Sequence, residues 1–179
     1  AKMGKSEDWV LQRIAEMMKA GYRGAKRADP NCVYGGAGQP SGVDCSAHFP
    51  FSRKVFTLAG DYTDMFHLDC YTWPRYFKQG WKVQSPEELK LTDILKEALA
   101  IAGPKKRCWI AEYGFGLSLN EAMDSPSAKS LADYMARSYL LAASVPRIEM
   151  LQWFACWECV EGESSYDMWR WPNPLPVVA

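Results

Sequence analysis

The sequence predicts an α/β fold in which parallel strands alternate with helices, as in a (β/α)8 TIM barrel. Helical and strand-like periodicities alternate along the chain in the order α-β-α-β-α-β-α-β. Such alternation implies parallel strands joined by right-handed crossovers. Each βα unit takes about 40 residues, near the pace of a barrel of roughly 250 residues, so four strands make half of one. We expect residues 1–179 to form a single domain that supplies this half.

Four segments predict helices, the first from apolar residues at helical spacing and the third and fourth from start or stop signals. Ser6 is a candidate N-cap before two acidic residues, and Asp29-Pro30 ends the first helix. Pro86 takes the first position of the third helix, ahead of an acidic residue. The helices are expected at residues 6–28, 53–58, 85–102 and 126–144.

Four short segments predict strands. The alternation after Met65 places His67, Asp69 and Tyr71 on one face of a strand, opposite an apolar face. The strands are expected at residues 32–34, 65–71, 108–110 and 149–157. Residues 37–51 are rich in Gly, Pro and Ser and predict a long loop, and the proline-punctuated tail predicts irregular chain.

Composition excludes several classes of protein. Hydrophobic residues make up 48% and charged residues 23%, which favours a packed core over disorder. The 21 basic and 21 acidic residues balance, so a nucleic-acid binder is not expected. The longest apolar runs fall short of the roughly 18 residues of a membrane helix. Residues 1–8 are polar, and we expect no signal peptide there.

The cysteines and glycines predict no metal and no cofactor. Four of the six cysteines fall in expected strands, where a buried thiol behaves as a small hydrophobe. Cys156 and Cys159 form a single CxxC without a second pair or a nearby histidine. The glycine-rich residues 35–38 lead into a proline-containing loop, whereas a phosphate-binding loop leads into a helix.

Residues 109–114 (WIAEYG) carry the strongest functional signal. Glu112 ends an apolar strand and is followed by turn glycines. Barrel enzymes present catalytic groups in this way, at the carboxyl ends of their strands. A capping or salt-bridging glutamate at a strand end is the alternative interpretation.

The chain resembles the carboxyl-terminal half of the clan A retaining β-glycosidases, with a style of sequence close to families 39 and 5. Four landmarks carry the resemblance across nearly the whole chain, in the order of barrel strands five to eight. These landmarks are residues 27–31 (RADPN) with Gly35-Gly36, 64–71 (DMFHLDCY), 109–114 (WIAEYG), and 151–154 (LQWF) with 166–169 (YDMW). The resemblance implies a hydrolase that cleaves O-glycosidic bonds of an oligo- or polysaccharide by double displacement.

The resemblance also implies roles for individual residues. Glu112 corresponds to the nucleophile, and Tyr71 would hydrogen-bond and orient its carboxylate. For Trp153 a sugar platform and interior packing both stay open, and for Tyr71 a structural role stays open too. Eight tryptophans would suit either an aromatic core or sugar stacking. The remaining candidates for substrate contacts are Asp69, His67, Trp73 and Trp157.

The sequence departs from the family pattern at two points. The family shows His-x-Tyr at the end of strand six, whereas here Asp69 precedes Tyr71 and His67 lies two residues earlier on the same face. The acid/base glutamate, which follows an asparagine at the end of strand four, has no counterpart before the first helix, and Asn120-Glu121 follows strand seven instead.

These departures lead to one expectation about partners and to one alternative function. The acid/base is expected outside this chain, and the barrel is expected to be completed by a separate N-terminal half or by a second copy, because a half-barrel leaves strand edges unpaired. The alternative function is a non-catalytic carbohydrate-binding protein on a degenerate barrel, which needs the aromatic residues but not the acid/base.

Overall fold

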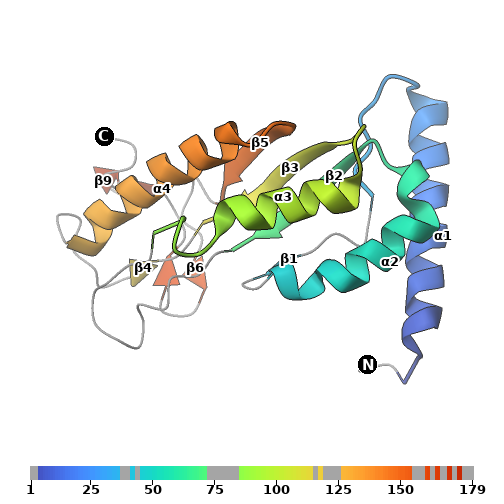
Figure 1. Cartoon of the computed structure of the whole chain (residues 1–179), viewed down its shortest axis with the longest axis horizontal. Coiled ribbons are helices and arrows are strands. Elements are labelled where there is room, and N and C mark those ends of the chain that lie inside the picture. The colour runs from blue at the N-terminus through green and yellow to red at the C-terminus, as the bar shows by residue number, and fades with distance from the viewer. Residues whose placement is uncertain are drawn as a thin grey trace.

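The computed structural model of the chain is a parallel sheet with helices packed on one side (Figure 1). It describes residues 4–36, 41–42, 45–71, 85–114, 117–118, 126–154, 160–161, 164–165, 169–170 and 173–174. The helices are α1 (Glu7–Ala28), α2 (Phe49–Ala59), α3 (Leu91–Ala102) and α4 (Pro126–Ser144), with 3-10 turns at Cys45–His48 and Gly60–Tyr62. The strands are β1 (Ser41–Gly42), β2 (Met65–Cys70), β3 (Arg107–Tyr113), β4 (Leu117–Ser118), β5 (Ile148–Trp153), β6 (Val160–Glu161), β7 (Ser164–Ser165), β8 (Trp169–Arg170) and β9 (Asn173–Pro174).

The main sheet has the strand order β1-β2-β3-β5, and every neighbouring pair in it is parallel. Helix α3 connects β2 to β3, and α4 connects β3 to β5, as a parallel sheet requires. The α/β class with parallel strands is therefore confirmed, and the half-barrel stays a prediction. The sequence did not predict two small antiparallel sheets: in one, β4 and β6 flank β7, and in the other, β8 pairs with β9.

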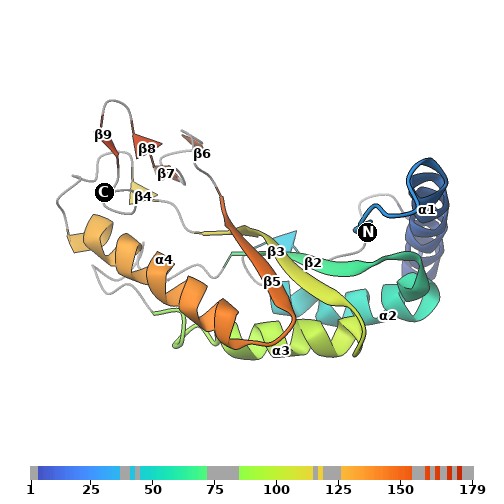
Figure 2. The same cartoon turned by 90° about the horizontal axis from the view of Figure 1, so that it is seen from above.

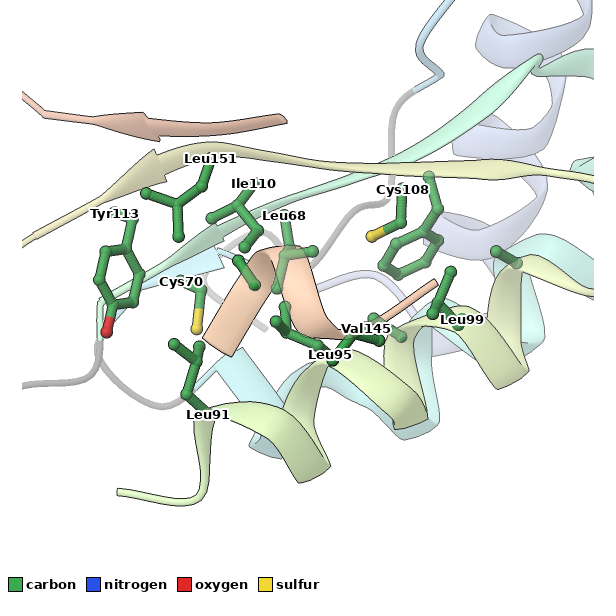
Figure 3. Packing of buried hydrophobic residues seen from close by; sticks show 14 of the residues in the cluster. Leu68, Cys70, Leu91, Leu95, Leu99, Cys108, Ile110, Tyr113, Val145 and Leu151 are labelled. Carbon is green, nitrogen blue, oxygen red and sulfur yellow. The ribbon is translucent and has the colours of Figure 1, made fainter. Parts of the chain in front are cut away.

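The core lies between the sheet and the helices α2, α3 and α4, which cover one face (Figure 2). Leu68 of β2, Ile110 of β3 and Leu95 of α3 are fully buried there (Figure 3). Burying such a side chain contributes about 1.5–3 kcal/mol. Among the described residues, no α-helix covers the opposite face (Figure 2). We call this side, which none of the described α-helices covers, the open face of the sheet.

Helix α1 forms as predicted and packs against α2 at one end of the molecule (Figure 1). Its N-cap is Ser6, whose hydroxyl accepts a hydrogen bond from the Trp9 amide at 3.2 Å. Leu11 and Met18 meet Val55 of α2 in a second buried cluster. The position of α1 is therefore set by α2, which in turn belongs to the main core.

Residues 32–34 do not form the strand that the sequence predicts, so this prediction is wrong. Only Gly35 forms a bridge with the start of β2. The amide of Tyr34 donates its hydrogen bond to the side chain of Asp64, at 2.8 Å from Oδ2. It is therefore not available for a backbone hydrogen bond to a neighbouring strand. The place beside β2 is shared by Gly35 and, nearer the carboxyl end, by β1.

Two helix boundaries also differ from the predictions. Part of the loop expected over residues 37–51 is helical, because α2 begins at Phe49 and accepts Pro50 in its first turn, where no amide partner is needed. Helix α3 begins at Leu91, later than expected, because Lys90 has a left-handed conformation with φ 59° that interrupts the helix. The predicted strands after Met65 and Cys108 are confirmed, and the last strand is confirmed as far as Trp153.

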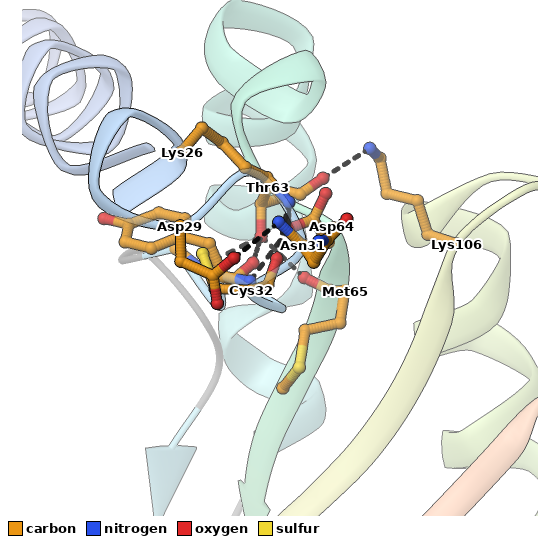
Figure 4. Close-up of polar contacts among 10 residues, drawn as sticks. Lys26, Asp29, Asn31, Cys32, Thr63, Asp64, Met65 and Lys106 are labelled. Atoms are coloured by element: carbon orange, nitrogen blue, oxygen red, sulfur yellow. Dashed lines mark hydrogen bonds and ion pairs between the residues drawn. The ribbon is translucent and has the colours of Figure 1, made fainter. Parts of the chain in front are cut away.

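A cluster of polar contacts holds the segment after α1 against the start of β2 (Figure 4). Lys26 Nζ lies 2.8 Å from Asp64 Oδ2 and also donates to Cys32 O at 2.5 Å. Burial raises the pKa of Asp64, but the hydrogen bonds from Lys26 and Tyr34 outweigh burial, and the pKa is lowered from its ordinary 3.8. The cluster thus stabilises the ionised form of Asp64.

This lowered pKa predicts an acid-sensitive contribution to stability. Because Asp64 binds its proton less readily in the folded state, its contribution is complete above pH 3.8 and is lost as the pH falls through the lowered pKa. We expect Asp64→Asn to unfold at lower urea concentration than the wild type at pH 7 and to converge with it at acid pH. Asp133→Asn, at an exposed site on α4, is the control. A wild-type advantage that stays constant down to pH 2 would contradict the role of this pair.

Candidate active site

The carboxyl ends of β2, β3 and β5 lie at the same edge of the sheet, because the three strands are parallel. Tyr71 directly follows β2, Glu112 is the penultimate residue of β3, and Trp153 ends β5. In α/β folds of the barrel type this edge carries the catalytic groups. The structure therefore brings three of the predicted site residues to one end of the sheet, although not all to one face.

An extra residue in β3 decides which face Glu112 meets. On the β2 side, Ile110 and Glu112 pair with consecutive residues, and on the β5 side two residues of β3 stand opposite one. Strict alternation from Cys108 and Ile110 would turn Glu112 toward the helices. The extra residue instead turns Tyr113 toward the helices, where it is fully buried, and leaves Glu112 half-buried on the open face.

The side chains of Tyr71 and Glu112 meet on the open face. Tyr71 Oη donates a hydrogen bond of 2.5 Å to Glu112 Oε2 in a partly buried position. The Tyr71 ring is also packed edge-to-face on Phe154, with centroids 6.2 Å apart. The contact that the resemblance implies is thus present, and it fixes one oxygen of the carboxylate.

Asp69 and His67 share the open face with Tyr71, as the alternation in β2 predicts. Asp69 is the register partner of Glu112, and His67 stands beside Trp109, further from the carboxyl edge. Burial lowers the pKa of His67, and the nearby charge of Asp69 offsets only part of this effect. A neutral imidazole at pH 7 follows, which can both donate and accept hydrogen bonds. Asp69 is therefore nearer to the carboxylate of interest than His67.

Trp153 lies on the helix side of the sheet, away from Glu112. Its side chain is 3% exposed and packs edge-to-face against Tyr113 and Tyr134, with centroids 5.9 and 6.5 Å apart. Of the two roles that the sequence left open, this burial favours interior packing over a sugar platform. The physical reason is that Trp153 pairs in register with Tyr113, so both side chains turn toward α4.

Several sequence predictions fall outside the described residues. Trp73 and Trp157 lie there, as do Asn120 and Glu121. Within the described ranges, no group of three or more His, Cys, Asp or Glu side chains is arranged to hold a metal ion. Burial raises the pKa of the Cys108 thiol to about 12, which makes it an unreactive part of the core. None of the helices in the described part of the chain has the length and apolar character needed to cross a bilayer.

Sequence reasoning missed the residues that support the site from behind. Tyr113 donates a hydrogen bond to Tyr134 of α4 at 2.8 Å and contacts Ser138. The sequence did contain a signal. Two residues, Ala111 and Glu112, separate Ile110 from Tyr113, whereas strict alternation would place one residue between two core side chains. Such a break in a strand pattern indicates a bulge.

Comparisons with known proteins add only a weak likeness. No family model matches the chain, and no curated protein matches it. A β-glucuronidase from Ruminococcus gnavus in complex with D-glucuronic acid superposes with a TM-score of 0.46 at 11% identity, over 78% of this chain and 30% of that chain. A second structure of Ruminococcus gnavus β-glucuronidase gives 0.44 at 11% identity, over 94% and 35%. The chain thus spans about a third of the length of these structures.

The contact between Tyr71 and Glu112 predicts an energetic coupling. In a double-mutant cycle with Tyr71→Phe and Glu112→Gln, we expect a coupling energy of about 1–3 kcal/mol in urea unfolding at pH 7. The control cycle pairs Tyr71→Phe with Glu149→Gln, whose carboxylate is exposed on β5. It should give a coupling close to zero. Equal couplings in the two cycles would refute the hydrogen bond as a specific interaction.

Proposed function

We propose that the chain carries the nucleophile half of a retaining glycoside hydrolase, with Glu112 as the nucleophile. The observation that supports this proposal is the 2.5 Å hydrogen bond from Tyr71 to Glu112, on the open face at the carboxyl end of the sheet. Tyr71 holds Oε2 of the carboxylate, which leaves Oε1 to attack. A carboxylate that only caps a strand or pairs with a surface cation needs no such hydroxyl, so the contact favours a catalytic role.

The proposed reaction is a double displacement. Oε1 of Glu112 forms a bond to the anomeric carbon while the glycosidic C–O bond breaks, and the leaving oxygen takes a proton from the acid/base. Water then gives a proton to the same acid/base, and its oxygen attacks the anomeric carbon and releases the Glu112 carboxylate. We assign the acid/base to a segment outside this chain, either a separate N-terminal half or a second copy that completes the barrel.

Further residues are assigned to substrate contacts in this proposal. Asp69 stands beside Glu112 in register, and His67 shares its face, so both suit hydrogen bonds to sugar hydroxyls. Trp73 and Trp157 are proposed for wider subsites on the basis of the sequence alone. A ligand rich in hydroxyl groups fits this set, because a carboxylate accepts hydrogen bonds and a neutral imidazole both accepts and donates them.

A covalent trap tests the nucleophile without the missing acid/base. We expect activated 2-deoxy-2-fluoro aryl β-glycosides, tried with several sugars, to leave a glycosyl adduct on Glu112, because a good leaving group needs little acid assistance. Intact mass spectrometry detects the adduct, and peptide mapping locates it. Glu112→Gln should give no adduct, whereas Glu149→Gln should react like the wild type.

The same reagents separate the two classes of function. Folded wild-type protein that gives no adduct with any sugar, yet binds oligosaccharides in calorimetry, would favour the non-catalytic carbohydrate-binding protein. An adduct on a carboxylate other than Glu112 would keep the class of enzyme and refute the assignment of the nucleophile.

A further inference from the structure

We propose that Tyr113 is a positioning residue for Glu112: its buried hydroxyl network with Tyr134 and Ser138 keeps the extra residue in β3 and so keeps Glu112 on the open face. The catalytic consequence rests on the proposed function, whereas the structural consequence does not. In this proposal Tyr113 does not touch the substrate and acts on Glu112 through the backbone of β3.

The network joins β3 to α4 beneath the sheet. Tyr113 Oη donates to Tyr134 Oη at 2.8 Å and lies 2.9 Å from Ser138 Oγ. Ser138 Oγ in turn donates to the carbonyl oxygen of Tyr134 at 2.7 Å. Tyr113 and Ser138 are 0% exposed and Tyr134 is 2% exposed. The rings of Tyr113 and Tyr134 also stack, with centroids 6.0 Å apart and planes at 11°. In the observed register the hydroxyl of Tyr113 therefore has two buried partners on α4.

A regular β3 would exchange the two neighbouring side chains. Without the extra residue, Tyr113 would turn to the open face and Glu112 would enter the core beside Leu91 and Leu95. The carboxylate would be buried among apolar groups, and the hydroxyls of Tyr134 and Ser138 would lose a buried partner, both of which are unfavourable. Both effects favour the observed register. The second effect requires the hydroxyl of Tyr113, which a phenylalanine would lack.

A second path connects Tyr113 to the partner of Glu112. The amide of Phe154 donates to the carbonyl oxygen of Tyr113 at 2.9 Å, and the Phe154 ring packs edge-to-face on Tyr71. A shift of β3 at Tyr113 would thus move Glu112 directly and Tyr71 through Phe154. The hydrogen bond between Tyr71 and Glu112 should be the first contact to weaken.

The first experiment measures this contact without any sugar. The double-mutant cycle of Tyr71→Phe and Glu112→Gln is repeated in a Tyr113→Phe background, which keeps the stacked ring and removes only the hydroxyl. We expect the coupling found in the wild-type background to be lost. A coupling of unchanged size would overturn the inference, because Glu112 would then keep its place without the network.

The second experiment measures the rate of covalent trapping. For Tyr113→Phe we expect the rate constant of inactivation by the reactive 2-fluoro glycoside to fall about 10- to 100-fold with little change in reagent affinity, because misplacing a reacting group lowers rate more than binding. Val145→Ala is the destabilised control, because Val145 is 3% exposed and belongs to the same core. It should lower thermal stability and leave trapping unchanged. A Tyr113→Phe variant that behaves like this control would show a purely structural role and overturn the inference.

Two further arms keep the result interpretable. Ser138→Ala removes a smaller group of the same network, and it replaces Tyr113→Phe in both experiments if the latter does not fold. If the wild type gives no adduct but the coupling depends on Tyr113, the proposed hydrolase fails and the positioning of Glu112 by Tyr113 stands. If the wild type is trapped on Glu112 and neither variant changes coupling or rate, the hydrolase stands and the positioning fails.

Discussion

The parallel sheet has two unlike faces, and the extra residue in β3 decides which of them receives a charge. The helix side is closed by α2, α3 and α4 around Leu68, Leu95 and Ile110, so a carboxylate there would be desolvated without compensation. The open face is partly hydrated and carries polar neighbours. The irregularity after Ile110 sends Tyr113 into the core and Glu112 to the open face. The hydrogen bond from Tyr71 depends on this choice.

The two ends of the sheet are built by different means. At the carboxyl end, hydroxyl groups of Tyr113, Tyr134 and Ser138 bond beneath the sheet, and Tyr71 bonds above it. At the amino end, Lys26 and Asp64 connect the segment after α1 to the start of β2. The hydroxyl network of Tyr113, Tyr134 and Ser138 beneath the sheet is buried and neutral, whereas the second arrangement, Lys26 with Asp64, is partly exposed and charged. Acid should therefore weaken the second arrangement directly, whereas the buried hydroxyls bear no charge to titrate in that range.

A carboxylate held by a tyrosine on the open face is half of the machinery that a retaining mechanism needs. The second carboxyl group must stand about 5–5.5 Å from the first. Asp69 is the adjacent register partner of Glu112, but the proposed reaction uses it for substrate contacts and takes the acid/base from the complementary half. In the proposed function, the complementary half meets this chain at the open face and at β5, which ends the described part of the main sheet.

The sequence by itself determined the local elements. The Ser6 cap and apolar spacing located α1, and alternation placed Asp69 and Tyr71 on one face, because these signals come from residues close together in the chain. Only the tertiary structure decided the face of Glu112 and the burial of Trp153. Tyr113 pairs in register with Trp153 on the helix side, and its hydroxyl partners lie 21 and 25 residues away in the chain. The strand predicted at residues 32–34 failed for the same reason, since a side chain 30 residues away takes the Tyr34 amide. Local periodicity cannot encode partners that meet only after the chain has folded.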